Sequence, residues 1–188
     1  MKVTDRAYAL ELDKNDPLGD YRSKFVITDP NLCYLDGNSL GRLPHATVKA
    51  VGDFLSQEWG NEVVTGWSHW IDEAQVAGDL LGRAVLGAGA GQVLVCDTTS
   101  VNFYQLCLAA ISARPGRKTI ITDAANFPTD RYILDGIAKS HGLKLVIIDN
   151  EDPEIAENEL ITAELLEKYM SEDVALETFQ VIQYRSGA

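Results

Sequence analysis

The stretch TIITDAANFPTDRYI, residues 119–133, decides the fold that the sequence predicts. It opens with four β-branched residues, residues 119–122, in a short apolar run that is typical of a buried strand. Polar and turn-forming residues follow from Asp123 to Asp130, and a helical pattern then begins. A buried strand that leads through a short turn into a helix is half of a βαβ unit, so the stretch indicates an α/β protein.

The same alternation extends to both sides of this stretch. The sequence predicts strands at residues 92–97, 118–123, 144–149 and 174–183, and helices at residues 101–113, 131–142 and 162–170. Alternating strands and helices with short apolar strands are typical of a mainly parallel sheet that is covered on both faces. We therefore expect an α/β three-layer sandwich.

The first ninety residues follow a different pattern. The sequence predicts a helical lead-in and a second short helix before residue 30, a short strand at residues 32–35, and a helix that starts after Pro44. An aromatic loop that contains Trp67, His69 and Trp70 then leads into another helix, which ends at a glycine C-cap between Gly87 and Gly91.

Composition excludes several classes of protein. The chain of 188 residues carries a net charge of −12, which argues against a nucleic-acid surface because phosphate binding needs clustered cations. Its three cysteines show no CxxC spacing, so a disulfide framework and a zinc site are not expected. We see no signal peptide and no apolar run of about 18 residues, so we predict a cytoplasmic protein without a membrane partner.

The unusual residues gather where the predicted strands end, which is where parallel sheets bind ligands. After the first of these strands come Thr98, Thr99 and Ser100. Their hydroxyls and the free N–H groups of the next helix could hold an anion, or one of them could simply cap the helix. Neither GxGxxG nor GxxxxGK[ST] is present, so no dinucleotide fingerprint or P-loop is indicated.

Phe127 and Asp130 form the second candidate site. Pro128 restricts Phe127 to extended backbone conformations, which would present the aromatic ring as a stacking face for a flat ligand. Burial in the core is the ordinary alternative for Phe127, and helix capping is the ordinary alternative for Asp130.

Two further candidates lie in the first half of the chain. Asn38 and Ser39 could face a substrate, although turn formation alone explains the DGN sequence of residues 36–38. The two tryptophans and the histidine of GWSHW, residues 66–70, could line an aromatic pocket or fill a core. No cluster of His, Cys, Asp or Glu has the spacing of metal ligands.

Taken together, these segments resemble kynureninase, a pyridoxal 5'-phosphate enzyme of fold type I, the aspartate-aminotransferase class. The similar segments are YLDGNSLGRLP at 34–44, EWG with GW and Trp70 at 58–70, VCDTTSVNFYQL at 95–106, NFPTDRYI at 126–133 and YRSGA at 184–188. They occur in the order and spacing of that family. The pair LDGNSLG and FPTDRY is the most specific part of the resemblance.

The resemblance implies roles for these residues. Thr99 and Ser100 would hold the cofactor phosphate, Phe127 would stack on the pyridine ring, and the Pro128, Thr129 and Asp130 segment would lie beside the cofactor. Asn38, Ser39 and Trp67 would face the substrate. The implied reaction is hydrolysis of L-kynurenine, or its 3-hydroxy form, to anthranilate (or its hydroxy form) and L-alanine, in tryptophan catabolism and NAD biosynthesis. The resemblance also implies a homodimer for the complete protein.

The sequence departs from that family in length. Members are roughly twice as long, and their Schiff-base lysine lies beyond the YRSG segment, so no catalytic lysine is expected here. We divide the chain into an N-terminal lead-in and substrate loop, residues 1–45, and an incomplete cofactor-binding large domain, residues 46–188. We expect the N-terminal portion of a kynureninase, a fragment that is inactive alone. The alternatives are another fold type I enzyme, similar to cysteine desulfurases or epimerases, and a truncated non-catalytic binding module.

Overall fold

A computed structural model describes residues 2–149 and 161–187 of the chain. Contacts within the chain divide it into two compact units, Met1–Leu80 and Leu81–Ala188. Each unit is described by itself below. The division that we predict at residue 45 concerns where a cofactor-binding domain begins, and it stays a prediction.

The second unit contains a parallel sheet of three strands in the order β2-β1-β3. The strands are β1 (Thr119–Asp123), β2 (Lys144–Ile148) and β3 (Val174–Thr178). In the ladder between β1 and β2, Ile120 pairs with Leu145 and Ile121 pairs with Val146. All five residues of β1 are buried, as expected for a central strand with neighbours on both edges.

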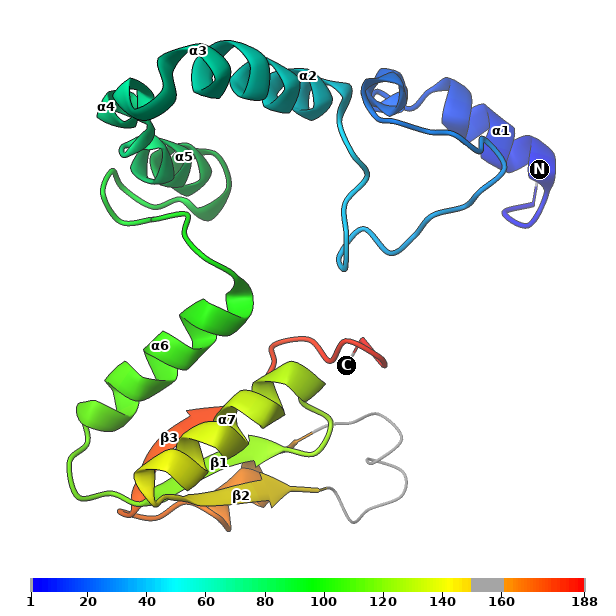
Figure 1. The fold of residues 1–188 in the computed structure, drawn as a ribbon. Coiled ribbons are helices and arrows are strands. Elements are labelled where there is room, and N and C mark those ends of the chain that lie inside the picture. Colours follow the sequence, from blue (N-terminus) through cyan, green and yellow to red (C-terminus); the bar gives the residue numbers. More distant parts are fainter. Residues whose placement is uncertain (1, 150–160, 188) are drawn as a thin grey trace. The chain divides into compact units, whose positions relative to one another are not determined.

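Helices cover both faces of this sheet. On one face, α6 (Thr99–Ser112) and α7 (Pro128–His141) pack against the side chain of Ile120. In Figure 1, α7 is drawn over the strands of the sheet. On the other face, α9 (Ala163–Glu167) packs against Ile121 and Ile148. Successive residues of a strand point to opposite faces, so Ile120 and Ile121 each anchor one layer. The α/β architecture with a mainly parallel sheet is therefore confirmed.

Local sequence explains where these helices start and stop. Apolar residues of α7 recur at helical spacing, with Leu134, Ile137 and Ala138 all buried. The helix begins at Pro128 and ends at Gly142, which adopts a left-handed φ of 64° as a C-cap. In α6, Thr98 is the N-cap, and its hydroxyl accepts a hydrogen bond from the N–H of Val101 at 3.3 Å.

Hydrogen bonds fasten the opposite end of β1 to β3. The backbone N–H groups of Lys118 and Thr119 both donate to the carbonyl of Asp173, each at 3.0 Å. The hydroxyl of Thr119 also donates to Asp173 Oδ2 at 2.6 Å. Because the partners lie more than fifty residues apart, these bonds fix the pairing of two distant segments.

Two predicted strands are wrong, and a third is shorter than predicted. Residues 92–97 precede α6 but form no strand, because no neighbouring strand pairs with them in the part of the chain that the structure describes. Leu94 and Val95 in that segment are therefore 57% and 44% exposed. Residues 32–35 also lack a ladder partner, and the predicted strand at 174–183 stops at Thr178.

The first unit is helical. It contains α1 (Arg6–Lys14), the 3-10 helix η1 (Gly19–Lys24) and α2 (His45–Asp53), which starts directly after Pro44 as predicted. The chain then continues through η2 (Phe54–Trp59), α3 (Gly60–Glu62), η3 (Val63–Gly66) and α4 (Trp67–Trp70). The predicted aromatic loop is thus a short helix. The last helix of the first unit is α5 (Glu73–Leu81), and η4 (Gly82–Leu86), which ends at Gly87 in the left-handed conformation, already belongs to the second unit.

The core of the second unit predicts the effect of a truncation. Leu134 is fully buried between α7 and the sheet, so Leu134→Ala should lower the free energy of unfolding by about 2–5 kcal/mol. Tyr132, two residues earlier on α7, is 74% exposed, and Tyr132→Ala should change it by less than about 0.5 kcal/mol. Urea denaturation followed by circular dichroism measures both. Equal losses in the two variants would contradict the packing of α7.

Candidate functional site

The candidate site lies at the carboxyl edge of the three-stranded sheet. Because the strands are parallel, β1, β2 and β3 all end at this edge, at Asp123, Ile148 and Thr178. The turn after β1 leads directly into α7, and the segment after β3 runs past the same edge. This is the place where open α/β sheets bind ligands.

Asn126 ties three segments together at this edge. Its side chain is 2% exposed, and its Nδ2 donates to the hydroxyl of Thr122 at 2.8 Å and lies 3.4 Å from the carbonyl of Thr178. Its Oδ1 accepts from the N–H of Phe127 at 2.7 Å and from Nε2 of Gln180 at 3.0 Å. One buried amide thus connects the end of β1, the segment after β3 and the start of α7.

The backbone conformation of Phe127 leaves its ring partly exposed at this edge. It is the N-cap residue of α7, with φ −54° and ψ 132°, the extended conformation that the following proline favours. Its ring is 42% exposed, so Phe127 is not a core residue. The ring of Tyr184 meets it edge to face, with centroids 5.0 Å apart. The structure therefore leaves part of an aromatic surface open beside the end of β1.

Asp130 is not the cap of α7. It is the third residue of the helix, and its backbone N–H donates to the carbonyl of Phe127 at 3.0 Å. The capping interpretation of its side chain is therefore wrong. Burial raises the pKa of Asp130. The charge of Asp130 also affects Cys107 on α6. Burial and, to a lesser extent, this charge raise the pKa of Cys107 to about 11.

Thr98, Thr99 and Ser100 start α6 in the second unit. Thr98 caps the helix, as the ordinary interpretation of this segment predicts. Thr99 and Ser100 are its first two helical residues, and no hydrogen bond joins their hydroxyls to other described residues. Asp97, which precedes the cap, has a left-handed φ of 47°, so the chain turns sharply into the helix.

The structure brings Phe127 together with Tyr184, whereas Thr99 and Ser100 begin α6. The charge of Asp130 contributes to the raised pKa of Cys107. Cys107 lies about two turns after Thr99 on α6, which is roughly 12 Å along the helix axis. Within the described residues, no hydrogen bond or ring contact connects the two groups. The predicted phosphate residues and the predicted stacking residue are thus not joined by a hydrogen bond or ring contact in the described part of the chain.

Asn38 and Ser39 lie in an exposed turn of the first unit. The N–H groups of Ser39 and Leu40 both donate to the carbonyl of Asp36, at 3.2 and 3.3 Å. The hydroxyl of Tyr34 closes the turn by donating to the carbonyl of Leu40 at 2.6 Å. The backbone bonds account for the turn and leave both predicted side chains exposed.

Trp67 and Trp70 have different environments. Trp67 begins α4 and is 62% exposed, whereas Trp70 packs on Phe54 with ring centroids 5.3 Å apart. The indole N–H of Trp70 donates to Glu58 Oε2 at 3.0 Å, and its ring covers Gly66 so closely that an added Cβ there would lie 2.3 Å from the ring. Trp70 therefore fills a small core, and Trp67 stays available to a ligand.

Sequence reasoning gave no role to three residues of the site, although Asn126 lies in the strand-end segment that it singled out. Asp123 and Gln183 are buried and hydrogen-bonded to each other, at 3.3 Å between Nε2 and Oδ1, and Asn126 links the segments as described above. A buried Asn in a turn has the same sequence signature as an exposed one. The only signal available was that these polar residues lie next to strand ends.

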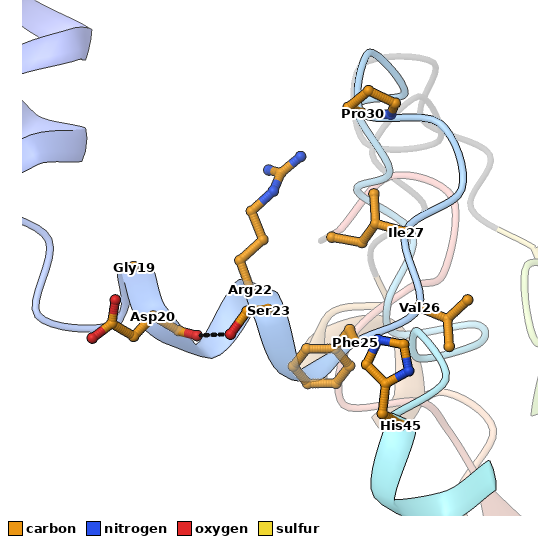
Figure 2. A pocket seen from close by; sticks show the side chains of 9 residues that line it. All are labelled: Gly19, Asp20, Arg22, Ser23, Phe25, Val26, Ile27, Pro30 and His45. Atoms are coloured by element: carbon orange, nitrogen blue, oxygen red, sulfur yellow. Dashed lines mark hydrogen bonds between the residues drawn. The ribbon is translucent and has the colours of Figure 1, made fainter.

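A pocket of about 580 Å³ lies in the first unit. In Figure 2, Phe25 and His45 lie side by side at one end, and Ile27 and Pro30 form another wall. It is lined by Gly19, Asp20, Arg22, Ser23, Phe25, Val26, Ile27, Pro30 and His45. None of the candidate site residues is among them.

Across residues 2–149 and 161–187, no three His, Cys, Asp or Glu side chains gather as metal ligands. No helix in that part of the chain is long and apolar enough to cross a membrane.

Comparison with known proteins gives a consistent match. The chain is 32% identical to a kynureninase of Pseudomonas fluorescens over 193 aligned positions, which cover 98% of this chain and 43% of that protein. It is 33% identical to a kynureninase of Deinococcus radiodurans, covering 100% of this chain and 44% of that protein. For a kynureninase of Geobacillus thermodenitrificans the identity is 34%, covering 96% and 42%. No protein-family model matches the chain.

These matches confirm the resemblance inferred from the motifs. The chain is a homologue of proteins named kynureninase along nearly all of its length. It spans less than half the length of these curated relatives, as expected for a portion of such a protein.

Asn126 gives a test of the site geometry. Asn126→Ala leaves the N–H of Phe127 without its side-chain acceptor and removes the bond to Thr122, so the free energy of unfolding should fall by about 1–3 kcal/mol. Gln105→Ala, at an exposed position of α6, is the control and should change it by less than about 0.5 kcal/mol. Thermal or urea unfolding measures both, and a stable Asn126→Ala chain would contradict the network.

Gly66 gives a second test, in the first unit. A side chain at this buried position would collide with the ring of Trp70, so Gly66→Ala should destabilise the unit by about 1–3 kcal/mol. Gly52 lies on α2, where an added Cβ meets nothing within 4 Å, and Gly52→Ala should be neutral or stabilising by up to about 1 kcal/mol. Tryptophan fluorescence during urea unfolding reports both variants. Similar effects of the two alanines would show that Trp70 does not cover Gly66.

Proposed function

We propose that this chain, as a homologue of kynureninases, supplies the N-terminal portion of a pyridoxal 5'-phosphate-dependent hydrolase that cleaves L-kynurenine or its 3-hydroxy form. The products would be anthranilate, or its hydroxy form, and L-alanine. The proposal depends on one observation: Phe127 is 42% exposed at the carboxyl edge of the sheet. The homologues of the chain are named kynureninase, and these names support the choice of kynurenine as the substrate.

The residues at this edge fit the cofactor. A flat pyridine ring needs an aromatic or apolar face, and Phe127 offers one that Asn126 and Pro128 hold in place. A phosphate group needs N–H and hydroxyl donors at the start of a helix, and Thr99 and Ser100 begin α6 with hydroxyls that are not used elsewhere in the described residues. The donor set is therefore appropriate for a phosphorylated aromatic ring.

Each residue would have a separate task in this site. Thr99 and Ser100 would hold the phosphate, Phe127 would stack on the ring, and Pro128, Thr129 and Asp130 would line the space beside it. When bound, the cofactor would supply an electron sink for cleavage of a carbon–carbon bond. The protein's own contribution is to bind and orient the ring and to limit the access of water.

Substrate contacts would come from the first unit. Asn38 and Ser39 have exposed side chains in a turn that the backbone already stabilises, so these side chains are free to bind polar groups. Trp67, which is 62% exposed, would contact the aromatic ring of the substrate. We propose that the complete protein is a homodimer and that its substrate is a small molecule.

Phe127 provides the test of cofactor binding. Phe127→Leu removes the aromatic face but keeps an apolar side chain, so the affinity for pyridoxal 5'-phosphate should fall by roughly 2- to 12-fold, which corresponds to about 0.5–1.5 kcal/mol of stacking. Tyr132→Leu, in the second turn of the same helix and 74% exposed, is the matched control and should keep the affinity of the unmodified chain. Titration followed by absorbance or fluorescence quenching measures both. A Phe127→Leu chain with unchanged affinity would contradict the stacking role.

Kynurenine cleavage provides the test of activity. None of the lysines in these 188 residues lies in a cofactor-attachment motif, so we expect the 188 residues alone to form no anthranilate from L-kynurenine. Anthranilate fluorescence, with and without added pyridoxal 5'-phosphate, measures the outcome. Cofactor-dependent formation of anthranilate would show that the 188 residues contain the catalytic group after all.

A further inference from the structure

Asp123 and Gln183 form a buried polar pair beneath the candidate site. Asp123 is the last residue of β1 and is 1% exposed, and Gln183 is 6% exposed in the segment that follows β3. The Nε2 of Gln183 donates to Oδ1 of Asp123 at 3.3 Å. Sixty residues separate them in the sequence, so the contact fastens the C-terminal segment to the central strand.

The remaining oxygens of this pair have no partner. Asp123 Oδ2 and Gln183 Oε1 are both buried and form no hydrogen bond. An ionised carboxylate has only acceptors, so beside a carboxamide it can use the amide N–H alone and leaves the amide oxygen unpaired. A protonated carboxyl group has an O–H donor and can bond to the amide oxygen as well. One proton on Asp123 therefore supplies the donor that both unpaired oxygens lack.

No cation near Asp123 favours its charged form. Within the described residues Asp123 takes part in no ion pair, and the guanidinium of Arg131 lies beyond ion-pair distance from it. Burial is the main influence and raises the pKa of Asp123, while Gln183 and the N–H groups of the following turn oppose it. The charged residues on the surrounding elements are Asp130, Arg131, Asp135 and Lys139 on α7, Lys144 on β2, Asp149 after β2, Glu177 on β3 and Arg185 in the C-terminal segment.

We propose that Asp123 is protonated in the folded protein at neutral pH and forms a two-bond acid–amide pair with Gln183. The pair would position the segment of residues 179–187 at the carboxyl edge of the sheet. That segment carries Tyr184, whose ring meets Phe127 edge to face. Asp123 and Gln183 are thus positioning residues for the aromatic face of the site. This role in the site rests on the proposed function, whereas the protonation itself does not.

The proposal fixes the sign of a pH dependence. Because the folded state raises the pKa of Asp123 above its ordinary value of 3.8, the folded state retains the proton when the unfolded chain loses it. The stability from this pair is fully present below about pH 4 and is lost as the pH rises toward the folded-state pKa. A chain without this ionisable group should lack that part of the pH dependence.

Asp123→Asn is the deciding variant, because an asparagine amide reproduces the protonated carboxyl group. Its Oδ1 can accept from Gln183 Nε2, and its Nδ2 can donate to Gln183 Oε1. We expect Asp123→Asn to match the unmodified chain in its urea midpoint near pH 4 and to exceed it increasingly as the pH rises to 8. Asp123→Leu, which can make neither bond, should have a lower midpoint than Asp123→Asn at every pH.

Infrared spectroscopy detects the proton in the unmodified folded chain, and Asp123→Asn assigns it. At neutral pH the folded chain should show a protonated-carboxyl C=O band, and this band should be missing from Asp123→Asn. Absence of the band from the unmodified folded chain would overturn the proposal. So would an Asp123→Asn chain whose midpoint falls as far as that of Asp123→Leu at pH 7.

Arg131→Met separates our proposal from one alternative. In that alternative Asp123 is ionised and forms an ion pair with the guanidinium of Arg131. Under our proposal this variant keeps the carboxyl band and the difference from Asp123→Asn. An ion pair would give the opposite sign: Asp123→Asn would fall below the unmodified chain as the pH rises, Arg131→Met would remove that difference, and this result would overturn the proposal. None of these measurements uses cofactor or substrate, so their failure is separate from a failure of the proposed function. A titration with pyridoxal 5'-phosphate then links the two: Asp123→Leu should bind more weakly than Asp123→Asn.

Discussion

The burial of β1 on both faces and both edges is the constraint on which the second unit depends. A strand that water cannot reach must satisfy every backbone N–H and C=O through its neighbours, so β2 and β3 have to lie beside it in register. The same burial directs Ile120 into the layer of α6 and α7 and Ile121 into the layer of α9. Polar groups at the end of the strand must also find partners, and this requirement produces the Thr122, Asn126 and Gln180 network that holds Phe127.

The elements that were predicted correctly are those whose signal is local. In β1 and β2 the runs of β-branched residues, and in α7 the apolar spacing between Pro128 and Gly142, are contained within a few residues of sequence. Residues 92–97 and 32–35 carry a similar apolar signal but form no strand, because a strand also requires a partner that may be far away in the chain. Pairing between distant segments is not visible in the composition of either segment.

The same distinction applies to the site. Pro128 and Phe127 were predicted because a proline acts on the residue directly before it. Asn126, Asp123 and Gln183 were given no role because their importance comes from burial and from partners more than fifty residues away. The cap of α6 shows the intermediate case: three successive hydroxyls indicated a helix start, but the sequence did not show that Thr98 would be the one to cap it.

The two pairings of β1 differ in the length of chain that they enclose. Partners in β2 are 25 residues away and partners in β3 are about 55 residues away, which makes closure of the second loop more costly by about 0.7 kcal/mol. Thr178, Gln180, Gln183 and Tyr184 all belong to the more distant segment. During synthesis these residues leave the ribosome after β1, α7 and β2, so the partners that complete the carboxyl edge emerge later than the strand and helix that they contact. The aromatic face of Phe127 therefore gains its surroundings only at the end of translation of this unit.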